Sequence, residues 1–181
     1  MTSNIHDITR SFRIVPPVDN AFVNENDEPI PFLPAPEIDR IGQHLIAECP
    51  ELAHLTTASI AYLWKRAGGK ASGRLTLGRT VLAPALLTFF DGYQFVIWVA
   101  ADNSRDLALN AMQFEALMFS QLMRADIDPE TAKPALRSPE VVAFTAEIAR
   151  YGAWTSELKD ARETFVQAPL IDQVVPFTSV A

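Results

Sequence analysis

LALNAMQFEALMFSQLMR, residues 107–124, carries the clearest structural signal in the chain. Apolar side chains cover nearly its whole circumference, most of its residues are strong helix formers, and no glycine or proline interrupts it. A helix that is apolar all round is normally buried inside a domain. We therefore expect residues 107–124 to form a buried central helix, with Asp102, Asn103 and Ser104 as candidates for its N-terminal cap.

Strand signals lie upstream of this helix. Residues 57–65 and 74–79 alternate in character on either side of a glycine-containing loop, which predicts a β-hairpin. Residues 93–100 (YQFVIWVA) are apolar on both faces, so they are expected to form a central strand. The pattern predicts an α+β fold in which a small mixed sheet, made of the hairpin and the central strand, packs on the buried helix.

Further helices and two extended segments complete the expected organisation. Residues 36–49 and 84–90 are predicted to be helical, and a polar connector over residues 125–139 precedes two more helices, which begin after Ser138 and at Thr155. The ends of the chain combine prolines with short apolar clusters. The predicted division is therefore an extended N-terminal arm (1–35), the α+β domain (36–166) and an extended C-terminal tail (167–181).

Composition bounds the class of protein. A chain of 181 residues with 49% hydrophobic and 20% charged residues is typical of one soluble globular domain. No apolar run approaches the ~18 residues of a membrane span. The polar N-terminus does not resemble a signal peptide, which predicts a cytoplasmic location without a membrane partner. The single cysteine, Cys49, excludes an internal disulfide and a cysteine-based zinc site, and is expected to be a packing residue.

Charge is unevenly distributed along the chain. The formal net charge of −7 argues against general binding to nucleic acid. One 15-residue stretch nevertheless contains no acidic residue and five basic ones, namely Lys65, Arg66, Lys70, Arg74 and Arg79. These residues either keep a hairpin solvated or form a recognition surface for an acidic protein partner.

Several phrases of the sequence resemble a known family. They are ELAHLTTASIAYLWK (51–65), GRLTLGR (73–79), DGYQFVIWVAAD (91–102), FEALMFSQLMR (114–124) and PEVVAFTAEIARYGAW (139–154). Across roughly residues 36–155 the chain resembles the phage metallopeptidase family, which is of zincin type. The resemblance implies a zincin-like sheet and helix arrangement and a phage source.

The resemblance also identifies a degenerate motif. Members that keep the motif carry His-Glu-x-x-His on the central helix, where two histidines bind zinc and the glutamate is the general base. Alignment on Ala116-Leu117 places these positions at Ser120, Gln121 and Arg124, and a further histidine position near Ser138. A guanidinium ~4 Å from a divalent cation costs about 8 kcal/mol at an effective dielectric constant of ~20. The resemblance therefore implies no catalytic residue, no metal and no cofactor.

These inferences favour a catalytically inactive, metallopeptidase-like phage protein in the host cytoplasm. It would act as a protein-binding or inhibitory module, with a host defence complex as one candidate target. Two alternatives remain open. One is a metal-dependent hydrolase with an unrecognised site, using His44 or His54 as ligands. The other is a structural or assembly protein of a virion. Separately, the carboxylates near the helix could hold calcium or magnesium, namely Glu115, Asp126, Asp128 and Glu130.

Overall fold

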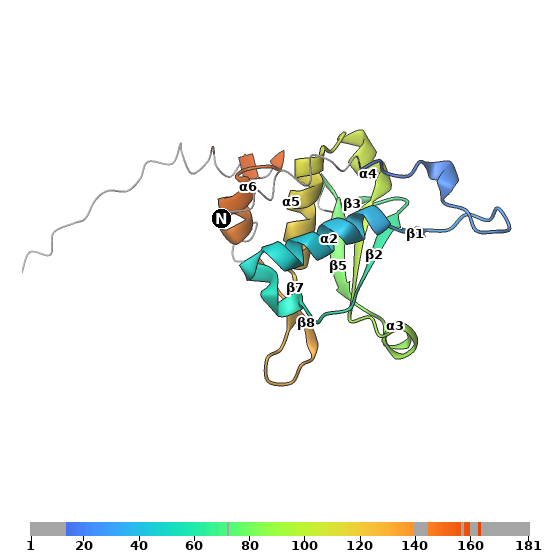
Figure 1. Ribbon diagram of the computed structural model, residues 1–181. Coiled ribbons are helices and arrows are strands. Elements are labelled where there is room, and N and C mark those ends of the chain that lie inside the picture. Colours follow the sequence, from blue (N-terminus) through green and yellow to red (C-terminus); the bar gives the residue numbers. More distant parts are fainter. Residues whose placement is uncertain (1–13, 72, 140–144, 157, 160–162, 164–181) are drawn as a thin grey trace, which may run out of the picture.

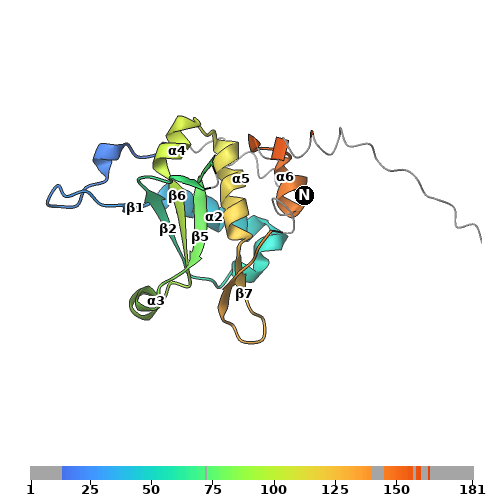
Figure 2. The same cartoon turned by 180° about the vertical axis from the view of Figure 1, so that it is seen from behind.

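The computed structural model describes residues 14–71, 73–139, 145–156, 158–159 and 163, and it has an α+β fold (Figure 1). Its main sheet has four strands in the order β1-β2-β6-β5. Their bounds are β1 (Phe32–Pro34), β2 (Ile60–Lys65), β5 (Gly78–Leu82) and β6 (Phe95–Ala100). Helices α2 (Pro36–Glu48) and α5 (Ala111–Leu122) pack against one face of this sheet (Figures 1 and 2). The predicted fold class is confirmed.

Strand β6 lies inside the sheet, as its sequence predicted. Each of its six residues is buried. It pairs in parallel with β2 and antiparallel with β5, so both of its edges are hydrogen-bonded. A strand that is apolar on both faces is most stable at this inner position, because neither face must meet water.

The predicted hairpin between residues 57–65 and 74–79 is wrong. Strands β2 and β5 do not pair, because β6 lies between them. Trp98 of β6 is in register with Leu63 on one side and with Arg79 on the other. The segment between β2 and β5 instead forms its own two-stranded ladder, β3 (Lys70–Ala71) with β4 (Arg74–Leu75). Strand β6, the most apolar strand, lies between β2 and β5. Local alternation alone does not specify which strands pair.

The central helix begins later than predicted. Asn110 caps α5 through a capping box, in which its side chain accepts a hydrogen bond from the Gln113 backbone N–H at 3.0 Å. The Gln113 side chain accepts one from the Asn110 N–H, also at 3.0 Å. The three residues expected to cap the helix lie inside a separate short helix, α4 (Ala101–Asp106). The reciprocal pair satisfies two N–H groups that a helix N-terminus otherwise leaves unpaired, and it therefore fixes the start of α5.

Burial of α5 follows the prediction. Every residue from Phe114 to Leu122 is buried. The Phe114 ring meets the Trp64 ring of β2 edge-on, with centroids 6.0 Å apart. Helix α2, predicted over 36–49, packs on the same core through its buried Ile38, Ile41 and Leu45. Because α5 contacts the sheet, α2 and α6 together, nearly its whole circumference is removed from water.

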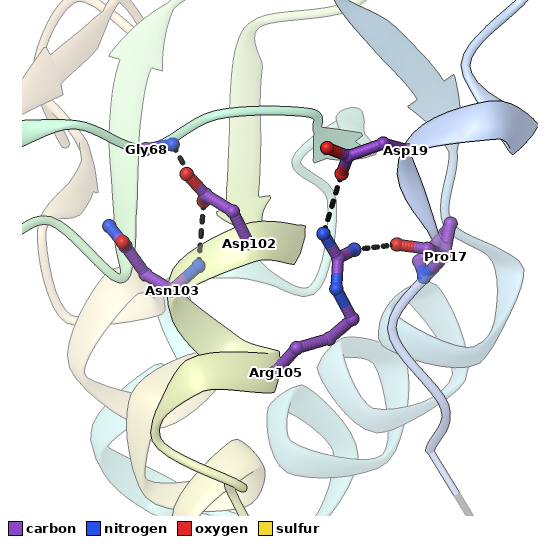
Figure 3. Close-up of polar contacts among 6 residues, drawn as sticks. All are labelled: Pro17, Asp19, Gly68, Asp102, Asn103 and Arg105. Carbon is purple, nitrogen blue, oxygen red and sulfur yellow. Dashed lines mark hydrogen bonds and ion pairs between the residues drawn. The ribbon is translucent and has the colours of Figure 1, made fainter.

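The described part of the N-terminal arm packs on the domain. Strand β1 pairs with β2, and the side chain of Phe22 is fully buried. Arg105 of α4 forms an ion pair with Asp19 at 2.6 Å and donates a hydrogen bond to the Pro17 carbonyl (Figure 3). Residues 1–13 and 167–181 lie outside the described residues, and the predicted division into arm, domain and tail stays a prediction.

Smaller elements complete the structure. The short helix expected over 84–90 is confirmed as α3 (Ala85–Asp91). The predicted polar connector contains a hairpin that was not expected, made of β7 (Ala125–Ile127) and β8 (Pro134–Leu136). The remaining elements are η1 (Asp19–Ala21), η2 (Pro50–Leu55) and α6 (Thr145–Tyr151). Most of the helix expected from Thr155 lies outside the described residues. No helix in the described part of the chain could cross a membrane.

Cys49 is a packing residue, as expected. It follows α2 and is 1% exposed. Arg150 of α6 donates a hydrogen bond to its Sγ at 3.0 Å. Burial raises the pKa of the Cys49 thiol to about 11, although the nearby Arg150 guanidinium acts in the opposite direction. The reactive form of cysteine is the thiolate, so this thiol is inert at neutral pH.

Candidate functional site

The degenerate motif positions lie at the C-terminal end of α5. Ser120 and Gln121 are buried in the last turn of the helix, whereas Arg124 follows its last residue, Leu122. The Arg124 backbone N–H still donates to the Gln121 carbonyl at 3.2 Å, so the chain continues to turn past the end of the helix. The helix expected to carry all three positions therefore carries only two.

Two cavities share Gln121 and Gly78 of β5 in their linings. The first has a volume of about 270 Å³ and contains Ser120 with Glu147 and Trp154 from the α6 region. The second has a volume of about 390 Å³ and is lined by Gly78, Arg79, Thr80, Gln121, Arg124, Leu136, Arg137 and Ser138. The structure thus brings Arg124 and Ser138 into one cavity and places Ser120 in the other.

Gln121 is held in place by β5. The Thr80 hydroxyl, itself buried, lies 2.7 Å from the Gln121 carbonyl and 3.2 Å from its Oε1, and it donates its single proton to these acceptors. At position 78 a Cβ would lie 3.0 Å from the Trp98 carbonyl and 3.6 Å from Gln121 Cγ. Glycine therefore avoids a close contact with the Trp98 carbonyl of β6, and Gln121 lines both cavities.

The chemistry at the motif positions does not fit zinc. A serine hydroxyl is a poor zinc ligand, a glutamine amide cannot act as a base at neutral pH, and a guanidinium repels a cation. Among the described residues, no group of three histidine, cysteine, aspartate or glutamate side chains could hold a metal ion. A carboxylate base and the histidine ligands are thus missing from the positions at which the resemblance expects them.

The alternative ligands serve local structure. His54 Nε2 lies 3.1 Å from the Ala125 carbonyl and 3.9 Å from Asp126 Oδ1. Glu115 is buried in α5 and accepts a hydrogen bond from the Tyr151 hydroxyl at 3.0 Å. Asp128 accepts backbone hydrogen bonds within its own turn, from Glu130 and Thr131, and these lower its pKa. His44, on α2, does not join these groups in a metal-binding cluster within the described residues.

The five basic residues singled out in the sequence lie on several elements. Lys65 ends β2 and places its Nζ over the Trp98 ring, 4.3 Å from the centroid. Lys70 and Arg74 are exposed on β3 and β4. Arg79, on β5, lines the second cavity instead, and Arg66 follows β2. The stretch is therefore not the single hairpin surface that the sequence suggested.

Sequence reasoning missed two parts of this site. Glu147 of α6 is buried, accepts a hydrogen bond from Trp154 Nε1 at 2.9 Å, and has no partner for its Oε2 in the described part of the chain. Arg137 reaches the second cavity because the β7–β8 hairpin returns the chain to α5, where the Arg137 N–H donates to the Arg124 carbonyl at 2.8 Å. The only sequence signal for Glu147 was a Trp seven residues after it, and the sequence contained no signal for the position of Arg137.

Comparison with known proteins now assigns a family. A family model described as "Putative phage metallopeptidase" matches residues 30–163. The chain belongs to this family. Neither a curated protein nor a solved structure matches it. The matched range contains β1, the whole four-stranded sheet, α5 and both cavities, so the family assignment covers the candidate site and confirms the resemblance.

Proposed function

We propose that this member of the phage metallopeptidase family is a catalytically inactive protein that acts as a protein-binding or inhibitory module in the host cytoplasm. The observation that carries the proposal is the set of side chains at Ser120, Gln121 and Arg124. A zinc peptidase needs neutral or anionic ligands and a carboxylate base at these positions. An alcohol, an amide and a guanidinium supply neither, although the family model matches residues 30–163.

An exposed apolar helix supports the protein-binding part of the proposal. Leu86, Phe89 and Phe90 of α3 are 73%, 80% and 75% exposed. The two phenylalanine rings meet edge-on with centroids 5.1 Å apart, and α3 has no buried residue. Large apolar side chains that gather on a surface are typical of protein–protein interfaces.

Charge supports a partner with an acidic surface. Lys70 and Arg74 are exposed on the β3–β4 ladder, in a stretch without acidic residues, while the chain as a whole carries −7. Such asymmetry accelerates the encounter with an acidic protein and is sensitive to salt. A host defence complex is one candidate for this partner.

The first test concerns metal. The purified protein should contain well under one equivalent of zinc, and a chelator should leave its melting temperature unchanged, because no bound ion adds binding free energy to the folded state. Elemental analysis and thermal melting with and without chelator measure this. The matched control is a variant with Ser120→His, Gln121→Glu and Arg124→His, which restores the motif residue types. Stoichiometric zinc in the unaltered protein, with chelator-sensitive peptidase activity, would contradict the proposal and favour a hydrolase.

The second test concerns the partner. Lys70→Glu combined with Arg74→Glu should slow association with an acidic protein partner by about an order of magnitude at low salt. The reason is that the long-range attraction between these side chains and the partner becomes repulsion. Surface plasmon resonance at several salt concentrations measures the rate. Arg40→Glu with Lys133→Glu changes the net charge equally at other exposed positions and should have a smaller effect. An unchanged association rate in the first variant would show that these charges only solvate the loop.

A further inference from the structure

The second cavity is rich in hydrogen-bond donors. Three of its lining residues are arginines, Arg79 from β5, Arg124 after α5 and Arg137 after β8. Among the described residues, its lining contains no aspartate or glutamate, although the whole chain has 22 acidic residues against 15 basic ones. Three guanidinium groups around one cavity attract an anion and repel a cation.

Arg79 and Arg137 are accessible to a ligand. Arg79 and Arg137 are exposed, and neither forms an ion pair with a carboxylate within the described residues. Arg124 also interacts with another group of the chain, and phosphate binding at the cavity does not require it to be unpaired. A guanidinium presents several N–H groups in a rigid plane that matches the oxygens of phosphate or carboxylate.

The neutral groups of the cavity add donors of the same kind. The Thr80 hydroxyl lies 3.2 Å from Gln121 Oε1, and the Gln121 amide Nε2 is a hydrogen-bond donor. Ser138, an exposed residue of the lining, contributes a hydroxyl. A ligand that only accepts hydrogen bonds and carries more than one negative charge satisfies this combination best.

We propose that the cavity lined by Arg79, Arg124 and Arg137 binds a phosphate group, either as free phosphate or as the phosphate monoester of a small molecule. A phosphate dianion has twice the charge of a carboxylate and three strong acceptor oxygens. The volume of about 390 Å³ lies in the range of small-ligand sites and leaves room for an organic group beside the phosphate. The proposal goes beyond the protein-binding function and does not depend on it.

Calorimetric titration with inorganic phosphate, phenyl phosphate and benzoate, at constant ionic strength, tests the site on the full chain. Inorganic phosphate and phenyl phosphate should bind with one site per chain, and more weakly at pH 5 than at pH 7.5, because the second ionisation of phosphate has a pKa near ~6. Tighter binding of phenyl phosphate would identify the monoester as the source, and tighter binding of inorganic phosphate the free ion.

Variants connect binding to the cavity. Arg79→Gln and Arg137→Gln should each weaken binding by about tenfold or more, as expected for loss of a charge-assisted hydrogen bond. Arg40→Gln removes the same charge from α2, outside the cavity lining, and should leave binding unchanged. Because all three side chains are exposed, thermal melting should show that each variant remains folded.

Four outcomes would overturn the proposal. They are absence of binding at millimolar phosphate, equal loss in Arg40→Gln, equal affinity for benzoate and phenyl phosphate, and tighter binding of a single-stranded oligonucleotide than of phenyl phosphate. The last would assign the arginines to phosphodiesters of nucleic acid. None of these outcomes depends on whether the protein contains zinc or binds a protein partner.

Discussion

Leu122→Ala should lower the free energy of unfolding by about 2–5 kcal/mol, the range for truncating a large aliphatic side chain in a packed core. Leu122 is 0% exposed in the last turn of α5, and it belongs to a core cluster that also contains side chains of the sheet and of other helices. These elements cannot all collapse into the space that the substitution leaves, so the loss includes a cavity term as well as the lost burial. Urea denaturation followed by circular dichroism measures the change.

The matched control lies on the same helix. Met112 in the first turn of α5 is 51% exposed, so Met112→Ala should change stability by less than about 0.5 kcal/mol. Both substitutions remove a large apolar side chain in favour of a good helix former, and they differ mainly in burial. Similar losses in the two variants would show that the C-terminal half of α5 does not lie in the core.

Gly68→Ala should be comparably severe, with a loss of about 2–5 kcal/mol. A Cβ at this position would lie 2.3 Å from the Thr76 carbonyl, 2.5 Å from Ala100 Cβ and 2.6 Å from Asn103 Nδ2. Overpacking of this kind typically costs about 1–3 kcal/mol. Buried Asn103 would also be displaced from the carbonyls of Gly69 and Thr76, to which its Nδ2 donates at 3.0 and 2.8 Å, at a further cost of about 1–3 kcal/mol.

Gly73→Ala separates crowding from backbone conformation. Apart from its two chain neighbours, no described residue has a heavy atom within 4 Å of a Cβ at Gly73, but its φ of +79° disfavours an L-residue by about 1–2 kcal/mol. Urea denaturation should therefore rank the two losses in the order Gly68→Ala above Gly73→Ala. Hydrogen exchange of the Thr76 amide, which donates to the Gly69 carbonyl at 3.1 Å, should accelerate in Gly68→Ala. Unchanged protection of that amide would mean that the loop absorbs the methyl group.

Local sequence patterns predicted the elements better than their pairing. Residues 93–100 indicated a buried strand, and residues 36–49 a helix, because each signal is contained within one segment. The partner of β2 depends on contacts across the chain, so alternation in residues 57–65 could not reveal it. The short β7 and β8 have three residues each, too few to show a period.

The candidate site was predicted only in part, for the same reason. The residue types at Ser120, Gln121 and Arg124 could be read directly from the sequence, and none of them matches the His-Glu-x-x-His motif. The sequence could not show that Arg79 and Arg137 line the same cavity as Arg124. Arg79 and Arg137 come together because β5 lies against β8, and no sequence pattern near either residue encodes that contact.

The parallel pairing of β2 with β6 has a consequence for which parts of the chain are free to vary. Ile60 and Phe95 pair although they are 35 positions apart, whereas Leu82 and Phe95 are 13 apart. Closing the longer loop costs only about 0.9 kcal/mol more, because closure entropy grows with the logarithm of length. The crossover carries the β3–β4 ladder and α3, where Lys70, Arg74 and the two exposed phenylalanines lie. Surface features can thus accumulate in the β3–β4 ladder and in α3, and be exchanged during evolution, with little effect on the sheet, whereas Gly68 and β5 in the same connection are constrained by packing and by strand pairing.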